Sequence, residues 1–197
     1  MYLYGASGHA KVIIDILENS GIEVSGLFDD NPAITEIYGQ EVYGQYGGQL
    51  LDTPLIISIG DNKIRSEISK NIKGKFGNAV HSSAIISPSA IIEEGSVIMQ
   101  GAIIQADSYI GKHAIINTNA SVDHDCVLKD YVHVSPGAIL CGNVYIGEGT
   151  HIGAGAVILP GVKLGSWCRI GAGSVVINEI PDGATAVGNP SRVIKVT

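Results

Sequence analysis

Aliphatic side chains recur every six residues through the second half of the chain, whereas the segment 1–79 shows no such period. Between Val80 and Val176 an Ile, Leu or Val stands at seventeen consecutive positions spaced by six: 80, 86, 92, 98, 104, 110, 116, 122, 128, 134, 140, 146, 152, 158, 164, 170 and 176. These three residue types make up less than a third of the chain, so composition alone does not explain the series. The pattern predicts a repeat architecture.

The position four residues after each aliphatic one carries small residues over most of the series. They are Ala84, Ala90, Ser96, Ala102, Ser108, Ala114, Ala120, Cys126, Ala138, Thr150 and Ala156. An inward aliphatic residue, an inward small residue and Gly, Asn or Asp at the bend describe a short parallel strand that turns a corner in every repeat. Three repeats form one triangular coil, so residues 18 apart should lie above one another at a strand spacing of about 4.8 Å.

The segment 1–79 alternates strands with amphipathic helices. We expect strands at "YLY", "GLFDD" and "PLIISIG", and helices at "AKVIIDILENSG" and "DNKIRSEISKNI", the second with Asp61 and Asn62 as candidate caps. This order predicts a small parallel α/β domain over residues 1–79. The β-helix should follow over 80–178, and the tail, 179–197, leaves the six-residue register and should fold back on the last coils.

Three loops of the predicted α/β domain should open on one edge of its sheet. Gly5, Ser7, Gly8 and His9 join the first strand to a helix, whose N-terminus can face a phosphate. Asp29 and Asp30 end the second strand, and Gly60 ends the third. The glycines are equally consistent with a turn that serves only packing, and the acids with a solvated loop. Their convergence nevertheless favours a ligand cleft at the carboxyl ends of the strands.

Two histidines stand out in "SVDHDCVLKDYVH", residues 121–133. His124 lies two residues past the inward Val122, and His133 lies one before the inward Val134, so both should be solvent-side or interface groups at corners or outer surfaces. They are nine residues, or half a coil, apart and should lie near different edges of one chain. In a three-fold oligomer His124 can face a neighbour's His133, with Asn117 close to the latter. The active site would then lie between subunits.

Asp123 and Asp125 flank His124, and a carboxylate bonded to an imidazole raises its basicity and fixes its tautomer. This is the arrangement of a general base, although a lone exposed histidine is more often a plain surface residue. We keep the surface interpretation for His81, His113 and His151. His151 also stacks one coil beyond His133, where it could touch a ligand.

Composition and charge exclude several classes of function. The formal charge of -7 and the pI near 5.2 give no electrostatic reason to bind nucleic acid or an anionic membrane. The start shows no secretion signal, and no apolar run approaches the roughly 18 residues of a membrane span, so we expect a cytoplasmic protein. Three cysteines without a C-x-x-C pair suggest neither a disulfide framework nor a cysteine zinc site.

The segments "YGASGH", "FDD" and "SIG", the six-residue repeats, "SVDHDC", "HVSPGA" and the tail "GNPSRVI" together resemble the bacterial sugar O- and N-acyltransferases of the NeuD and PglD type. The resemblance covers nearly the whole chain. It implies a Rossmann-like α/β subdomain followed by a left-handed parallel β-helix, a handedness that the repeat arithmetic does not give. It also implies a homotrimer that transfers an acetyl group from acetyl-CoA to a sugar, commonly the 4-amino group of a UDP-linked amino-dideoxy sugar.

The resemblance also implies roles for single residues. His124 would be the general base and Asp125, where the bacillosamine branch often has glutamate, would increase its basicity. Contacts to acetyl-CoA would come from His133 and the Gly142 backbone at the thioester and from Ala154 and Ala172 along the CoA arm. Contacts to the nucleotide-sugar would come from Ser7, Gly8, His9, Asp29, Asp30, Gly60 and Asn117. No metal is required, and Cys126 sits at an inward position that argues against an acyl-cysteine.

Three alternatives remain open at the level of sequence. The acceptor could be a hydroxyl of sialic acid or another sugar. Some left-handed β-helix trimers bind zinc through three interface histidines and are hydratases, and this chain offers His124, His133 and His151. A non-catalytic nucleotide-sugar-binding trimer would use the repeats only for assembly.

Most of the positive charge near the last coils comes from Lys163, Arg169, Arg192 and Lys195, and CoA phosphates could bind there.

Overall fold

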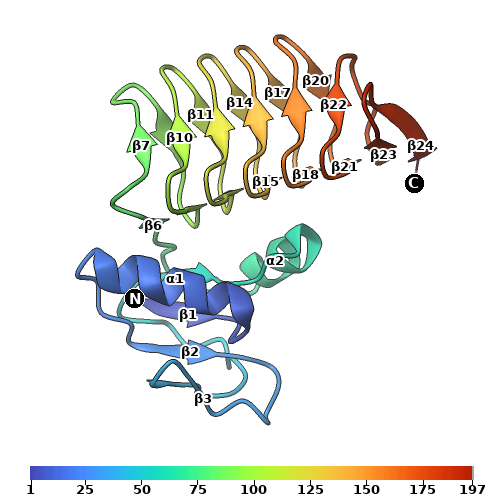
Figure 1. The fold of residues 1–197 in the computed structure, drawn as a ribbon. Coiled ribbons are helices and arrows are strands. Elements are labelled where there is room, and N and C mark those ends of the chain that lie inside the picture. The colour runs from blue at the N-terminus through green and yellow to red at the C-terminus, as the bar shows by residue number, and fades with distance from the viewer. Residues whose placement is uncertain (197) are drawn as a thin grey trace.

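The computed structural model describes residues 1–196 as an α/β domain beside a parallel β-helix (Figure 1). The domain contains three parallel strands in the order β2-β1-β5, two helices and a small hairpin. Its elements are β1 (Tyr2–Tyr4), α1 (Gly8–Asn19), β2 (Gly26–Phe28), β3 (Glu36–Ile37), β4 (Gln40–Glu41), β5 (Leu55–Ile57) and α2 (Asn62–Ser69). The three strands and both helices were predicted, and the β3–β4 hairpin was not.

The apolar pattern explains what α1 buries, and an N-cap explains where α2 begins. α1 starts at Gly8, two residues before the apolar pattern, and buries Ile13, Ile14, Ile16 and Leu17 on one stripe. At α2 the Asp61 carboxylate accepts hydrogen bonds from two backbone N–H groups of the first turn, as an N-cap does. Asn62 is not a cap, because it lies inside the helix and its side chain points to the β-helix.

The β-helix has one two-residue strand for each of the seventeen predicted positions. Its strands are β6 (Ala79–Val80), β7 (Ile85–Ile86), β8 (Ile91–Ile92), β9 (Val97–Ile98), β10 (Ile103–Ile104), β11 (Tyr109–Ile110), β12 (Ile115–Ile116), β13 (Ser121–Val122), β14 (Val127–Leu128), β15 (His133–Val134), β16 (Ile139–Leu140), β17 (Tyr145–Ile146), β18 (His151–Ile152), β19 (Val157–Ile158), β20 (Lys163–Leu164), β21 (Arg169–Ile170) and β22 (Val175–Val176). Strands three apart pair in parallel, so His133 pairs with His151 in the next coil. The predicted register is confirmed.

Three sheets form the sides of the coil, and each is named here by one of its strands. The β13 sheet has the order β22-β19-β16-β13-β10-β7, and the β14 sheet has the order β20-β17-β14-β11-β8. The β15 sheet runs β24-β23-β21-β18-β15-β12-β9-β6. The second residue of each two-residue strand points into the coil, and the first points out.

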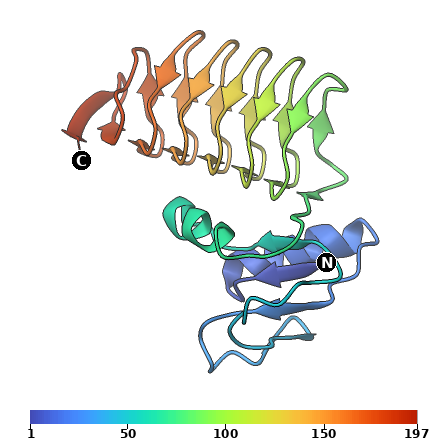
Figure 2. The ribbon, with the colours of Figure 1, turned by 180° about the vertical axis from the view of Figure 1, so that it is seen from behind.

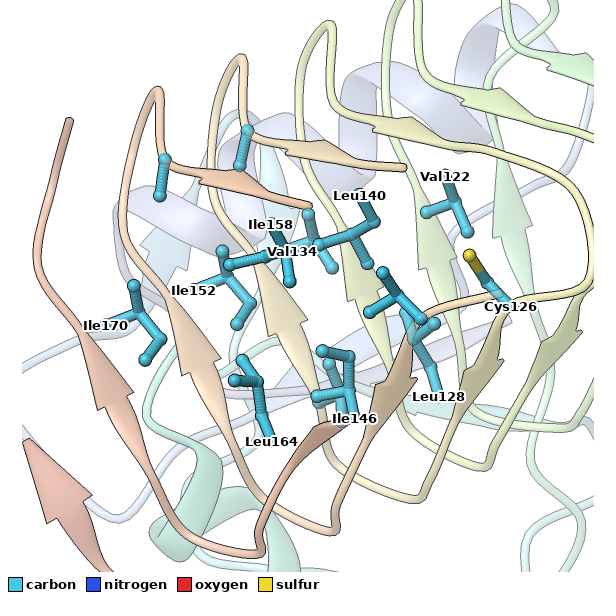
Figure 3. Close-up of a cluster of buried hydrophobic side chains, with 14 of the residues drawn as sticks. Val122, Cys126, Leu128, Val134, Leu140, Ile146, Ile152, Ile158, Leu164 and Ile170 are labelled. Atoms are coloured by element: carbon cyan, nitrogen blue, oxygen red, sulfur yellow. The ribbon is translucent and has the colours of Figure 1, made fainter. Parts of the chain in front are cut away.

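The inward side chains form one continuous core (Figure 3). From Ile98 to Val176 every predicted aliphatic position is at most 3% exposed, while Val80, Ile86 and Ile92 in the first coil are partly buried. The inward hydroxyls are satisfied: the Ser108 hydroxyl, for example, donates to the Asp123 carbonyl and accepts from the Cys126 N–H. Most of the small positions therefore hold either alanine or a side chain whose hydroxyl bonds the backbone.

The tail packs on the last coil by extending the β15 sheet. β23 (Ala184–Val187) pairs in parallel with β21, and β24 (Arg192–Val196) then pairs antiparallel with β23 at the end of the coil (Figure 2). Figure 2 also shows α2 beside the β-helix. Among residues 1–196, no helix combines the length and the apolar character that a membrane span needs.

Candidate active site

His124 and Asp125 form an exposed hydrogen-bonded pair at the corner after β13. His124 Nδ1 lies 2.7 Å from Asp125 Oδ2, and the two side chains are 58% and 59% exposed. Asp125 has φ 58°, a left-handed conformation that aspartate tolerates better than most residues. The hydrogen bond to Asp125, and next the negative charge of Asp123, raise the pKa of His124. The ring therefore presents Nε2 as a strengthened base.

Gly142 lies one coil beyond His124 and directly against its ring. A Cβ atom at position 142 would come within 2.7 Å of His124 Cε1 and 2.8 Å of Nε2, closer than real Cβ contacts. Only glycine lets the imidazole lie in this place. Among the described residues the Gly142 N–H donates no hydrogen bond, whereas its carbonyl accepts one from Gly161. A base and an available backbone donor thus lie side by side.

His133 occupies a different side of the coil and is buried. Its outward position on β15 is only 9% exposed, because the α/β domain covers this part of the β15 sheet. We expected a solvent-side or interface group; His133 is not on the solvent side, and the surface that covers it belongs to its own chain. The repeat tells which way a side chain points, but not what covers the outer face.

A short network sets the tautomer of His133. The Asn117 Oδ1 atom accepts from the Thr118 N–H at 2.8 Å, so the Asn117 amide nitrogen, 3.1 Å from His133 Nε2, acts as the donor. His133 then carries its proton on Nδ1. Its ring also stacks on His151, with centroids 4.8 Å apart and planes 11° apart.

Burial first, and then the nearby His151, Arg65 and His9, lower the pKa of His133 to about 3. His9 is affected similarly, because burial and Arg65 lower its pKa to about 4. Both rings are therefore neutral at pH 7. The Gly60 backbone also lies close to His133. One cluster of this chain therefore contains His9, Gly60, Asn117 and His133.

The ends of β1, β2 and β5 meet at one edge, as predicted. Asp29 Oδ2 accepts from the Ala6 N–H at 2.6 Å and Oδ1 from the Asn31 N–H, so this carboxylate braces the glycine loop. The exposed Asp30 accepts from the Tyr4 hydroxyl through one oxygen. Ser7 caps α1 by position, without a side-chain hydrogen bond, and both Ser7 and Gly8 are exposed. The loop is thus built and presents its backbone outward.

The remaining predicted residues lie elsewhere on the coil. Ala154 and Ala172 are exposed and stack at the corners after β18 and β21, whereas Gly142 lies at the corner after β16. Arg169 pairs in register with His151 on the β15 sheet. Cys126 is fully buried, and burial raises the pKa of its thiol to about 11. One chain thus contains two separate groups of predicted site residues. The His133 cluster lies on the β15 sheet, and the His124–Asp125–Gly142 group lies at the corners that follow the β13 sheet.

Sequence reasoning missed Arg65. It is 1% exposed on α2 and makes hydrogen bonds to both parts of the chain. Nothing in "DNKIRSEIS" distinguishes it from an ordinary solvated helical arginine. The surface interpretation was also wrong for His113, which is buried at the junction between the α/β domain and the β15 sheet and stacks on Tyr131. Within residues 1–196, no three His, Cys, Asp or Glu side chains of the chain cluster as metal ligands would.

Comparison with known proteins agrees with this architecture. Residues 1–72 match the PglD N-terminal domain family, and residues 143–178 match the bacterial transferase hexapeptide (six repeats) family. GDP-perosamine N-acetyltransferase of Escherichia coli O157:H7 is 31% identical over an alignment of 213 positions, gaps included, that covers 98% of this chain and 95% of that protein. The chain belongs to the family of PglD-type hexapeptide-repeat sugar N-acetyltransferases.

Solved structures of family members superpose over nearly the whole chain. PerB of Caulobacter crescentus, in complex with CoA and GDP-perosamine, has a TM-score of 0.91 and 37% identity and covers 98% of this chain and 96% of its own. The acetyltransferase domain of PglB from Neisseria gonorrhoeae has a TM-score of 0.90 and 36% identity, covering 98% of both chains. The uncharacterised protein L142 of Acanthamoeba polyphaga mimivirus is 34% identical over 114 residues, which are 56% of this chain but only 23% of that protein.

Proposed function

We propose that the protein transfers the acetyl group of acetyl-CoA to the 4-amino group of a nucleotide-linked amino-dideoxy sugar, with UDP as the first carrier to test. The observation that carries this proposal is the His124–Asp125 pair in contact with Gly142. It places an imidazole of raised basicity beside a backbone N–H that makes no hydrogen bond within the described chain. The relatives' names support an N-acetyl transfer, and the Caulobacter complex with GDP-perosamine makes a GDP carrier the second to test.

The reaction needs only proton transfer and oxyanion stabilisation. The sugar amine attacks the thioester carbon, and its proton passes to His124 Nε2, while Nδ1 keeps its hydrogen bond to Asp125. The C–S bond then breaks, and CoA leaves with the proton that His124 returns. A positioned histidine of this kind typically contributes about 10² to 10⁴ in rate. The Gly142 N–H is the donor that we assign to the tetrahedral oxyanion.

The other site residues divide between the two substrates. We assign His133 to the acetyl group together with Gly142, and the exposed corners at Ala154 and Ala172 to the CoA arm. The nucleotide-sugar is assigned to the loop edge of the α/β domain, through Ser7, Gly8, His9, Asp29, Asp30 and Gly60, and to Asn117. In this assignment Asp29 acts mainly by bracing the loop, because both of its oxygens already accept backbone hydrogen bonds.

We propose a homotrimer with the active site between subunits. The β15 sheet is partly covered by the chain's own α/β domain, whereas the β13 sheet presents an outward row that is aliphatic at five of six positions. The row is Ile85, Ile103, Ser121, Ile139, Val157 and Val175. Ile85 is 65% exposed and Ile139 44%. Such a stripe is typical of an interface, and His124 follows directly on it.

Turnover on a substrate panel tests the function. Purified protein, acetyl-CoA and a thiol-release assay should be combined with UDP- and GDP-linked 4-amino sugars, their 4-hydroxy analogues, and sialic acid. We expect turnover with a 4-amino sugar and none with its hydroxy analogue. Turnover only with sialic acid would make the protein an O-acetyltransferase, and tight nucleotide-sugar binding without turnover would make it a binding protein.

Complementation between two inactive variants tests the shared site. His124→Ala and His133→Ala chains should each be inactive, and mixed trimers should recover part of the activity, because some interfaces then contain both native residues. Subunit exchange must be verified by mass, using one tagged chain. No recovery in verified mixed trimers, or full activity in a proven monomer, would contradict an intersubunit site.

A further inference from the structure

A buried arginine links the two parts of the chain. The Arg65 guanidinium donates through all five of its N–H groups at 2.9 to 3.1 Å, so no donor is left unpaired. The acceptors are the backbone carbonyls of Ile59, Gly60, His113 and Tyr131 and the side-chain oxygen of Asn62.

None of these five acceptors is a carboxylate. Burial lowers the pKa of Arg65 to about 10, which still leaves it charged at neutral pH. A buried cation without a paired acid is unfavourable unless its hydrogen bonds are complete. The planar fork of a guanidinium can satisfy five oxygens in fixed directions, and the three donors of a lysine ammonium cannot. The geometry therefore requires arginine and not only a positive charge.

The acceptors come from the two regions that the proposed function assigns to the substrates. Ile59 and Gly60 belong to the loop after β5, where we place the nucleotide-sugar. Tyr131 lies two residues before His133 on the corner leading into β15, and His113 lies on the same corner of the preceding coil. One rigid plane thus bonds the nucleotide loop and the strand that carries His133.

Asn62 continues the same link toward the next coil. Its side-chain nitrogen donates to the Gly149 carbonyl at 3.0 Å while its oxygen accepts from Arg65. Gly149 lies one full coil beyond Tyr131, so consecutive coils are held by neighbouring residues of α2.

We propose that Arg65 is a positioning residue, whose guanidinium sets the distance between the nucleotide-sugar loop at Gly60 and the strand at His133. This inference rests on the proposed function for its catalytic consequence. Misplacing a bound substrate by about 1 Å can reduce the rate about 10²-fold. Arg65 bonds the Gly60 loop directly, whereas the CoA arm is assigned to Ala154 and Ala172, which Arg65 does not contact. We therefore expect changes at Arg65 to alter the reaction of the sugar substrate while leaving the binding of the CoA arm nearly unchanged.

Two variants and one control test the proposal by steady-state kinetics. Arg65→Lys keeps the charge but not the fork, and Arg65→Met keeps the length without charge. Lys70→Met removes an exposed charge from the end of the same helix. For both Arg65 variants kcat/KM for the nucleotide-sugar should fall about 10²-fold relative to the control, with KM for acetyl-CoA within threefold. Circular dichroism and native mass should match the wild-type protein.

Several results would overturn the proposal. A folded Arg65 variant with sugar kcat/KM within threefold of Lys70→Met would show that the guanidinium does not position the loop. A rise in KM for acetyl-CoA as large as the rise in KM for the nucleotide-sugar would show a general defect. If Arg65→Met does not fold, Arg65→Lys decides alone, and if neither folds, Arg65 is only structural and the proposal is wrong.

Histidine NMR separates this inference from the proposed function, because it needs no turnover. The groups facing the His133 ring are His151, Arg65, His9, Asn117 and the Gly60 backbone. The wild-type ring should stay neutral with Nδ1 protonated to below pH 5. In a folded Arg65 variant a loosened junction admits water, and the pKa should move up toward 6.5. An unchanged His133 titration would overturn the inference, whereas a wild-type protein inactive on every sugar would overturn the function.

Discussion

The corner at His124 and the junction at His133 shift the pKa of a histidine in opposite directions. His124 is exposed and paired with a carboxylate, which raises its pKa. His133 is buried, near a guanidinium and stacked on another imidazole, and its pKa falls to about 3. The first ring is suited to take a proton, and the second to remain neutral and make a fixed hydrogen bond. Environment, and not residue type, assigns the roles.

The two environments also have different origins. The acid at the His124 corner is the next residue in the sequence, and the glycine beneath it is one coil away. The groups at the His133 junction come from α1, α2 and the loop after β5 as well as from the coil. Changes at the corner should therefore alter chemistry with little effect on folding, while changes at the junction should also alter stability.

The largest effect that separates the two regions should come from Gly142→Ala. Its Cβ would overlap the His124 ring, which is exposed and free to swing away, so the fold should persist while the base is displaced. We expect kcat to fall about 10²-fold with an unchanged melting temperature. Gly47→Ala, where the added Cβ meets only the Gln49 side chain at 3.4 Å, is the control. Undiminished kcat would show that the ring position is not required.

Asp125→Asn should have a smaller effect that appears mainly in the pH profile. Loss of the carboxylate lowers the pKa of His124, and since the base works unprotonated, the acidic limb of kcat/KM should move to lower pH. At high pH kcat should fall about tenfold, because a weaker base removes the proton less effectively. Asp107→Asn, at the same left-handed position one coil earlier, should leave both limb and rate unchanged. An unmoved limb would exclude His124 as the titrating base.

Acid should weaken the junction and not the corner. His113 and His133 have pKa values lowered to about 4 and about 3, so below pH 6.5 the unfolded chain binds protons that the folded chain does not. The free energy of unfolding should therefore fall as pH falls from 6.5 toward 4, by up to about 1.4 kcal/mol per pH unit for each histidine. Above pH 6.5 these groups should have no effect.

Urea unfolding at pH 7 and pH 5 measures this difference. His113→Asn, which tolerates the left-handed backbone at φ 54°, should remove about one histidine's share of the change. His81→Asn, at the first coil, should keep the wild-type difference. Equal differences in all three proteins would contradict a role for burial of His113 in the acid response.

The smallest effect should come from Cys126→Ala, next to the His124 corner. The thiol is fully buried, donates to the Cys141 carbonyl, and has a pKa raised to about 11. It is therefore not a nucleophile at neutral pH. We expect turnover within twofold of wild type and a loss of unfolding free energy of about 1 kcal/mol from the small cavity. A tenfold loss of turnover with a normal fold would revive an acyl-cysteine intermediate.

The repeat and the loop chemistry were readable from the sequence, because their causes are local. A side chain that recurs with a six-residue period must point inward each time, so the core from Ile98 to Val176 and the pairing of His133 with His151 followed from arithmetic. The His124–Asp125 contact joins adjacent residues at a corner. The convergence of Gly5, Asp29 and Gly60 follows from the shared direction of parallel strands.

The handedness came only from resemblance, and the β3–β4 hairpin, the strand-forming tail and the junction were not predicted. A periodic pattern states which side chains face outward, but the cover of an outer face depends on a separate segment of the chain. Burial of His133 therefore requires the α/β domain to dock on the β15 sheet. The five oxygens around Arg65 come from residues 59 to 131, and only the tertiary structure brings them to one guanidinium.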